Sequence, residues 1–205
     1  MRQGAPPPFS NLANPVDIHS LAIPDVKIIR PARHGDARGF LSETWNQRAF
    51  EEAGLHFDFV QENHSLSARK GTLRGLHFQS PPAAQDKLVR VAAGAVLDVA
   101  VDIRIGSPTF GAHVASVLSA ENWDQLLVPQ GFAHGFCTLT DDTQVIYKVT
   151  AYYAPTHDRG LAWDDPALGI DWGLAPSATI LSDKDRAHPV LKDLPAYFHV
   201  SNRAS

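Results

Sequence analysis

The sequence predicts a mainly β protein, an antiparallel sandwich or barrel with a few short helices. Short segments rich in Val, Ile, Leu and aromatic residues recur along the chain, separated by Gly, Pro, Asn and Asp. Many short strands at regular spacing are typical of sandwiches and barrels. The segment at 95–104 also alternates cleanly, with Leu97 and Val99 on one face and Asp98 and Asp102 on the other.

The composition fits one globular domain. All-β sandwiches commonly reach the 205 residues of this chain as a single unit. We expect a loose tail at 1–22, which is rich in Pro, Asn and Ser, and a single domain at 23–205.

Global charge and composition restrict the partners and the compartment. The net charge of −4 gives no general attraction to nucleic acid or to an anionic membrane, so we expect neither as a partner. A single cysteine, Cys137, excludes an intrachain disulfide and fits a reducing compartment. No apolar run approaches the roughly 18 residues of a spanning helix, and the N-terminus lacks the apolar core of a signal peptide. A cytoplasmic protein is expected.

The elements follow in order. Residues 25–45 are expected to form a strand, a turn around Gly35 and Asp36, and a second strand. Residues 46–55 are the best helix candidate, with Gly54 as the stop signal. Strands interrupted by turns are then expected in 58–67, 71–79, 86–104, 111–129 and 133–153. Residues 181–198 are expected to form loop and short helix packed against the sheets.

The strand-like segment 71–79, GTLRGLHFQ, places a guanidinium and an imidazole in apolar surroundings. Strict alternation points Arg74 and His77 to opposite faces, because they are three residues apart. Gly75 lies between them and permits a bulge or kink, so we predict an irregular backbone there. Arg74 and Lys87 border apolar runs, and a buried cation needs an anionic partner. Phosphate suits arginine, so a small anionic ligand is predicted.

Among the ten histidines, His77 and His134 lie within segments that are predicted to be strands. Each is either a core residue bonded to a backbone carbonyl or a functional group. The segments LHFQ and PQGFAHGF resemble the paired motifs of the cupin jelly rolls, which in metal-binding members supply His-x-His, a Glu and a second-motif His. Here no glutamate follows His77 before Gly94, which leaves two imidazoles and no carboxylate. Because metal sites normally use three or four ligands, no metal is predicted.

Three tyrosines lie in the segment YKVTAYY. Alternation places Tyr147 and Tyr153 on one face and Tyr152 on the other. They are either core aromatic residues with hydroxyl groups at the rim, or a phenol acid and a ring that stacks on a nucleobase.

These segments together resemble the dTDP-4-dehydrorhamnose 3,5-epimerase family from about residue 23 to residue 189. The matching text, in order, is GDARGFLSETW, FVQENHS, LRGLHFQ, QDKLVRVAAGAVLDVAVDIRIGSPTFG, LVPQGFAHGF, YKVTAYYAP, WDDPALGIDW and LSDKD. The resemblance implies a cupin-type antiparallel jelly roll, a homodimer, and no metal or other cofactor. It implies an isomerase that inverts carbons 3 and 5 of dTDP-4-keto-6-deoxy-D-glucose through enolate intermediates, to give dTDP-4-keto-L-rhamnose for dTDP-L-rhamnose biosynthesis.

The resemblance also assigns roles to residues. His77 would be the base, Asp185 its carboxylate partner, Lys87 the cation near the enolate oxygen, and Tyr147 the acid on the opposite face. Contacts with the sugar nucleotide carry over to Arg38, Glu43, Gln61, Glu62, Asn63, Arg74, His134, Tyr153, Asp158 and Lys184. Tyr153 would stack on thymine, and Asp158 replaces a glutamate of the family, which makes that contact less certain. Asp98 is either a supporting carboxylate or an outward strand residue.

Other functions stay open at this point. The nearest is an epimerase that inverts only carbon 3 or carbon 5 of a dTDP-4-keto-6-deoxy sugar, because such a relative can share the base and the tyrosine. A non-catalytic cupin that binds a sugar nucleotide would not need both His77 and Asp185. A metal-dependent cupin isomerase or oxygenase lacks its glutamate here. We also expect a dimer in which an arm around 25–31 crosses to the partner, with Arg38 or Glu43 reaching the neighbouring site.

Overall fold

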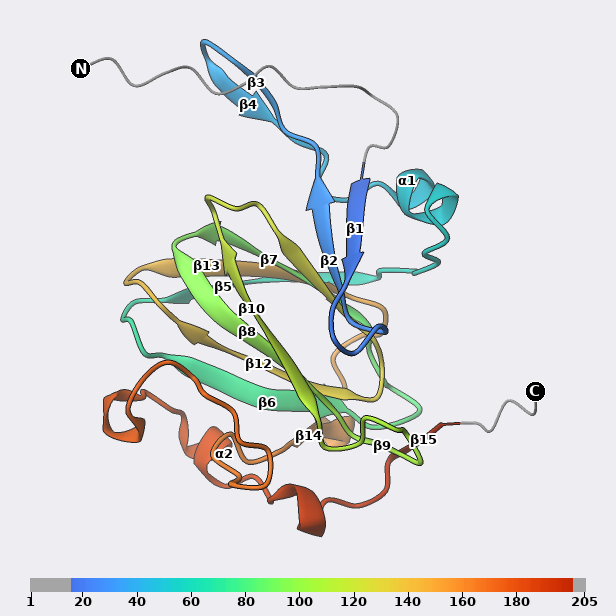
Figure 1. Cartoon of the computed structure of the whole chain (residues 1–205), viewed down its shortest axis with the longest axis vertical. Coiled ribbons are helices and arrows are strands. Elements are labelled where there is room, and N and C mark those ends of the chain that lie inside the picture. Colours follow the sequence, from blue (N-terminus) through green and yellow to red (C-terminus); the bar gives the residue numbers. More distant parts are fainter. Residues whose placement is uncertain (1–15, 201–205) are drawn as a thin grey trace.

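The computed structural model describes residues 16–200, and its body consists of two antiparallel sheets that face each other (Figure 1). The six-stranded sheet contains, in spatial order, β1 (Val16–Ser20), β2 (Lys27–Pro31), β11 (Gln125–Val128), β7 (Lys87–Ala93), β13 (Thr143–Val149) and β5 (Gln61–Ser67). The five-stranded sheet contains β10 (His113–Ser119), β8 (Ala95–Asp102), β12 (Phe132–Thr138), β6 (Leu73–Gln79) and β14 (Asp158–Gly160). The predicted antiparallel β architecture is confirmed.

Smaller elements surround the two sheets. The hairpin of β3 (His34–Asp36) and β4 (Gly39–Leu41) projects away from the body, and α1 (Gln47–Glu52) follows it (Figure 1). The C-terminal segment runs below β6 and contains α2 (Asp183–Arg186), while β9 (Arg104–Ile105) pairs with β15 (Phe198–His199). The described part of the chain also contains the 3₁₀ turns η1 (Pro155–His157), η2 (Pro176–Ala178) and η3 (Leu191–Asp193). Neither α1 nor α2, the α-helices of residues 16–200, is long and apolar enough to cross a membrane.

The N-terminal expectation is wrong for residues 16–20, which form β1 rather than a loose tail. β1 pairs with β2 along its whole length, and Val16 packs with Ile29 and Phe50 in a small apolar cluster. The strand signal of these five residues is weak beside the polar and Pro-rich sequence that precedes it. Residues 1–15 lie outside the described part. The proposed arm at 25–31 is also corrected, because β2 lies between β1 and β11 and β1 forms the edge.

The five-stranded sheet is buried on both faces. Its inner face packs against the other sheet through residues such as Val96 and Ala100, and its outer face is covered by C-terminal residues such as Trp172. Asp98 and Asp102 therefore point into the interior, and both are fully buried. Their alternation with apolar residues reflects two buried faces, so the outward reading of Asp98 is wrong. Polar groups can be buried when they have hydrogen-bonding partners.

The predicted irregularity at Gly75 is confirmed. The pairing of β12 with β6 changes register between His134 and Phe136, and Gly75 has φ of +125°. A Cβ at this position would lie 2.6 Å from the Cα of Gly135 on the neighbouring strand. The irregular backbone lets Arg74 and His77 line the same cavity.

We predict that Gly75→Ala lowers the free energy of unfolding by more than about 3 kcal/mol, because a positive φ and a backbone clash act together. Gly39→Ala is the matched control, since Gly39 has φ of +134° but nothing lies within 4 Å of where its Cβ would be placed. The control should lose only about 1–2 kcal/mol. Urea unfolding measures both, and equal losses would contradict the role of the close strand contact.

Candidate active site

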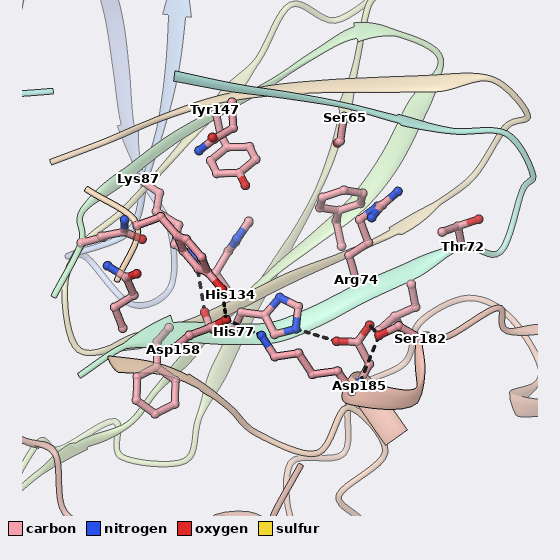
Figure 2. A pocket seen from close by; sticks show the side chains of 18 of the residues that line it. Ser65, Thr72, Arg74, His77, Lys87, His134, Tyr147, Asp158, Ser182 and Asp185 are labelled. Carbon is pink, nitrogen blue, oxygen red and sulfur yellow. Dashed lines mark hydrogen bonds and ion pairs between the residues drawn. The ribbon is translucent and has the colours of Figure 1, made fainter. Parts of the chain in front are cut away.

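A cavity of about 620 Å³ lies between the two sheets and is bordered on one side by the start of α2 (Figure 2). The strands β5, β6, β7, β12 and β13 each contribute side chains. Most of the predicted site residues line it together: His77, Lys87, Tyr147, Asp185, Gln61, Asn63, Arg74, His134, Tyr153, Asp158 and Lys184. Segments far apart in the sequence therefore meet at one site.

The short helix α2 holds the carboxylate partner of His77. Ser182 caps α2, since its Oγ accepts from the backbone N–H of Asp185 at 3.2 Å and donates to Asp185 Oδ2 at 2.7 Å. The other carboxylate oxygen, Oδ1, lies 2.5 Å from Nε2 of His77. Both oxygens of a nearly fully buried carboxylate are thus bonded, which fixes the orientation of the imidazole.

Asp185 is suited to remain ionised although it is buried. Burial acts to raise the pKa of Asp185, but the hydrogen bonds from His77 and Ser182 outweigh it and the pKa is lowered. An ionised carboxylate beside an imidazole stabilises the imidazolium that forms when the ring accepts a proton. The arrangement can therefore act as a supported base.

Lys87 brings a buried cation to the other side of the cavity. Its Nζ donates to the backbone carbonyl of His77 at 3.3 Å, and its side chain is buried. Burial lowers the pKa of Lys87 to about 8, although the charges of Asp98 and Asp158 act to raise it. A buried ammonium of this kind is stabilised by negative charge that develops nearby, as on an enolate oxygen.

A second histidine–carboxylate pair lies beside the first. His134 is the β12 neighbour of His77, and its Nε2 lies 2.7 Å from Oδ1 of Asp98. Both side chains are buried, and Oδ2 of Asp98 has no hydrogen-bonding partner within residues 16–200. Asp98 therefore supports a residue of the cavity wall, which is the functional alternative left open by the sequence.

The tyrosines differ sharply in position. The side chain of Tyr147, on β13, lines the cavity (Figure 2), and burial raises its pKa, partly offset by Arg74. Tyr152 is 70% exposed and does not line the cavity, so Tyr147 is the better placed phenol. Tyr153 lies at the rim, where its hydroxyl donates to Asp158 Oδ2 at 3.0 Å.

Asp158 and Lys184 close the rim beside Tyr153. Nζ of Lys184 lies 2.5 Å from Oδ2 of Asp158, the oxygen that also accepts from Tyr153. Burial acts to raise the pKa of Asp158, but the bonds from Lys184 and Tyr153 lower it overall. Asp158 thus reaches this edge of the cavity and bonds to both neighbours.

Three predicted contact residues do not line the cavity of their own chain. Arg38 is exposed on the β3–β4 hairpin and pairs with Asp36, and Glu43 accepts a hydrogen bond from Asn46. Glu62 points away because β5 alternates: Gln61 and Asn63 face the cavity, while Glu62 pairs with Lys148 on the opposite face.

Several lining residues were not predicted: Ser65, Thr72, Phe78, Gln79, Gln85, Phe136 and Ser182. Ser65 follows from the same alternation as Gln61 and Asn63, and the Ser-x-x-Asp spacing at 182–185 is an N-cap signal. Neither was used. His188, which lies next to Asp185, has no local sequence signal because it occupies an irregular segment.

His77, Asp185 and His188 bring potential metal-binding atoms within 4.8 Å of one another. The separation of 2.5 Å between His77 Nε2 and Asp185 Oδ1 is that of a short hydrogen bond. The arrangement fits a shared proton, and a site without metal stays a prediction.

The lowered pKa of Lys87 predicts a pH-dependent stability. The unfolded chain retains this proton up to about pH 10.5, whereas the folded chain releases it near pH 8. The wild-type free energy of unfolding should therefore rise, relative to Lys87→Met, by at most about 3 kcal/mol across that window. Urea unfolding of both proteins from pH 7 upward measures this. Lys192→Met, at an exposed lysine, is the control, and parallel curves for Lys87→Met and wild type would contradict the prediction.

Comparison with known proteins places this geometry in a family. A family model described as dTDP-4-dehydrorhamnose 3,5-epimerase matches residues 20–193. The enzyme of that name from Sinorhizobium fredii is 55% identical over 181 residues, which covers 87% of this chain and 91% of the relative.

Solved structures agree with this assignment. The dTDP-6-deoxy-D-glucose-3,5-epimerase of Legionella pneumophila, in complex with dTDP-4-keto-L-rhamnose, superposes with a TM-score of 0.86 at 44% identity, covering 91% of this chain and 99% of that one. A 3′-monoepimerase from Streptomyces bikiniensis, in complex with dTDP-quinovose, gives 0.78 at 36% identity, covering 85% and 87%. These neighbours confirm the cupin-type jelly roll, and the chain belongs to the dTDP-4-dehydrorhamnose 3,5-epimerase family.

Proposed function

We propose that this chain is a cytoplasmic dTDP-4-dehydrorhamnose 3,5-epimerase. It inverts carbons 3 and 5 of dTDP-4-keto-6-deoxy-D-glucose and yields dTDP-4-keto-L-rhamnose, a step of dTDP-L-rhamnose biosynthesis. The observation that carries the proposal is the His77–Asp185 pair on one wall of a cavity whose other wall presents Tyr147 and Lys87.

Inversion beside a ketone requires a base and an acid on opposite faces of the sugar ring. Nε2 of His77 is bonded to Asp185, and the other ring nitrogen faces the cavity, where it can take the proton (Figure 2). Tyr147 comes from β13 of the six-stranded sheet, opposite β6 of the five-stranded sheet. A sugar between the sheets would have the base on one side and the phenol on the other.

The enolate formed by proton removal places negative charge on the ketone oxygen. Lys87 and His134 are the buried groups of the cavity that can meet this charge, and Lys87 is the stronger electrostatic partner because it is cationic near neutral pH. Groups fixed in a water-poor site stabilise such charge more than water does, because they need no reorganisation.

The nucleotide part would lie toward Arg74 and Tyr153. Among the described residues, Arg74 hydrogen-bonds to neutral groups, the Oγ of Ser67 and the carbonyl of Leu66. Its charge is thus available to a diphosphate, which its planar fork suits. The exposed ring of Tyr153 can stack on thymine, a contact worth roughly 1–3 kcal/mol per base.

A single-carbon epimerase is the second candidate, favoured by the likeness to the 3′-monoepimerase. Incubation with dTDP-4-keto-6-deoxyglucose in deuterated water separates the two. NMR should find deuterium at both carbon 3 and carbon 5, since both protons are exchanged with solvent. Label at one carbon would identify the single-carbon enzyme. If no sugar nucleotide gains deuterium, the chain is a binding protein rather than an enzyme.

Variants separate the roles of the base and the acid. His77→Asn should nearly abolish exchange, whereas Tyr147→Phe should retain some exchange but lose inversion, because the base can return a deuteron to the same face. Each positioned acid or base typically contributes about 10²–10⁴-fold. Asp185→Asn should resemble a weaker His77→Asn, because it leaves the imidazole in place. Normal exchange by His77→Asn, or wild-type inversion by Tyr147→Phe, would contradict these assignments.

The protein is further proposed to act as a homodimer. Within residues 16–200, the six-stranded sheet ends in two strands with an unpaired edge, β1 and β5, and open edges favour pairing unless they are covered. The β3–β4 hairpin stands off the body and exposes Phe40 and Leu41, which are 52% and 72% accessible. Arg38 lies on the same hairpin, so contact with a partner would bring it toward the partner's cavity, followed along the chain by Glu43.

Mixed dimers test whether Arg38 acts on the partner's site. Arg38→Ala and His77→Asn should each be impaired alone, but their co-expression should restore activity to about a quarter of wild type, since half of the dimers then contain one intact site. Restoration requires a dimer with a shared site. No gain over the two parental variants, or a monomer in sedimentation at micromolar concentration, would contradict this.

A further inference from the structure

His188 lies beside the His77–Asp185 pair, yet no step of the proposed reaction uses it. Its ring stands edge-on to that of His77, with centroids 5.4 Å apart, and its side chain is only 10% exposed. Its Nε2 lies 3.9 Å from Oδ1 of Asp185, the oxygen bonded to His77. This nitrogen is buried and has no hydrogen-bonding partner among the described residues.

The chain makes room for this ring. A Cβ on Gly160 would lie 2.2 Å from Nε2 of His188 and 2.3 Å from two carbons of the ring. The φ of Gly160 lies outside the left-handed region, so its backbone does not require glycine. What requires glycine at position 160 is the space taken by the imidazole. Gly160 is paired with His77 across β14 and β6, so the slot opens directly beside the base.

The surrounding charges favour a neutral ring. The groups that face His188 are Asp185 and Lys184 from α2, His77 from β6 and Asp158 from β14. Burial lowers the pKa of His188, and the charge of His77 lowers it further, while the two carboxylates act to raise it. A neutral imidazole carries one proton, and the tautomer with that proton on Nε2 places the positive end of an N–H dipole 3.9 Å from Asp185 Oδ1. The other tautomer would direct a lone pair at a carboxylate.

We propose that His188 is a positioning residue. Its neutral Nε2–H lies 3.9 Å from Asp185 Oδ1, too far for a hydrogen bond, and its dipole limits how strongly that carboxylate holds the proton taken up by His77. The inference rests on the proposed function, in which His77 must be neutral before each turnover. With both Asp185 and Asp158 nearby, an imidazolium at His77 has two carboxylates to stabilise it. The nearby N–H dipole of His188 opposes that stabilisation and so favours the neutral form in which His77 acts as a base.

The sign of the effect is fixed by this geometry. Without the N–H group of His188, Asp185 would stabilise the proton on His77 more strongly. His77 would then stay protonated, and inactive as a base, up to a higher pH than in the wild type. In His188→Leu, the acidic limb of the kcat/KM profile should move to higher pH by on the order of 0.5–1 unit. The plateau at high pH should change much less, because there the base is already free.

Profiles of kcat/KM between about pH 5 and pH 9 test this, because they report the groups of the free enzyme. His188→Gln keeps a neutral donor at a similar reach and should retain the wild-type limb. His113→Gln, on β10, is the control for loss of a histidine elsewhere. An inactive wild type would refute the proposed function. An active wild type with an unmoved limb in His188→Leu would overturn only the role of His188.

Two further measurements test the proposal if His188→Leu does not fold. Gly160→Ala leaves His188 in the sequence but displaces its ring, so it should reproduce the limb shift of His188→Leu. Long-range ¹H–¹⁵N spectra of the wild type, with His188 assigned by comparison with His188→Gln, should show the proton on Nε2. A proton on Nδ1, or an unmoved limb in a folded Gly160→Ala protein, would overturn the proposal.

Discussion

The hydrogen bond between His77 and Asp185 is the interaction on which the site depends. It joins His77, on the interior strand β6 of the five-stranded sheet, to a residue of a short helix that lies 108 positions later in the chain. That helix is held in place because the C-terminal segment packs on the outer face of the sheet, where Leu161 and Trp172 are buried. The chemistry therefore depends on apolar packing on the face opposite the cavity. A loss of packing there would misplace Asp185 without touching the substrate.

Placing the cavity between two sheets determines the electrostatics of the site. A group on the inner face leaves water, so a charge there needs a partner or becomes neutral, a carboxylate by gaining a proton and an ammonium by losing one. Asp185 and Asp158 are stabilised by hydrogen bonds, whereas Lys87 has only a carbonyl and more distant carboxylates. The result is a cavity wall whose carboxylates are satisfied and whose ammonium still lacks an anion. In the proposed reaction, the negative charge of the enolate oxygen would provide the anion that this ammonium lacks.

Sequence reasoning identified much of the fold and site where local rules were sufficient. Alternation around Gly75 predicted the irregular backbone that the structure contains there, and the motifs of the family resemblance pointed to His77 and Asp185. It failed where tertiary contacts decide. Alternation alone cannot distinguish a solvated face from a second buried face, so Asp98 remained ambiguous. His188 could not be predicted, because only the path of the chain after α2 brings it next to His77 and Asp185.

The packing of the C-terminal segment also determines when the site can exist. Both sheets are complete once the chain has been made as far as Gly160, the last residue of β14. Asp185 and Lys184 follow later, and a chain that emerges from the ribosome folds from its N-terminus first. A nascent chain can thus close its jelly roll and present His77 while the carboxylate partner is still inside the exit tunnel. The chain therefore becomes catalytically competent only after both sheets of the jelly roll have formed.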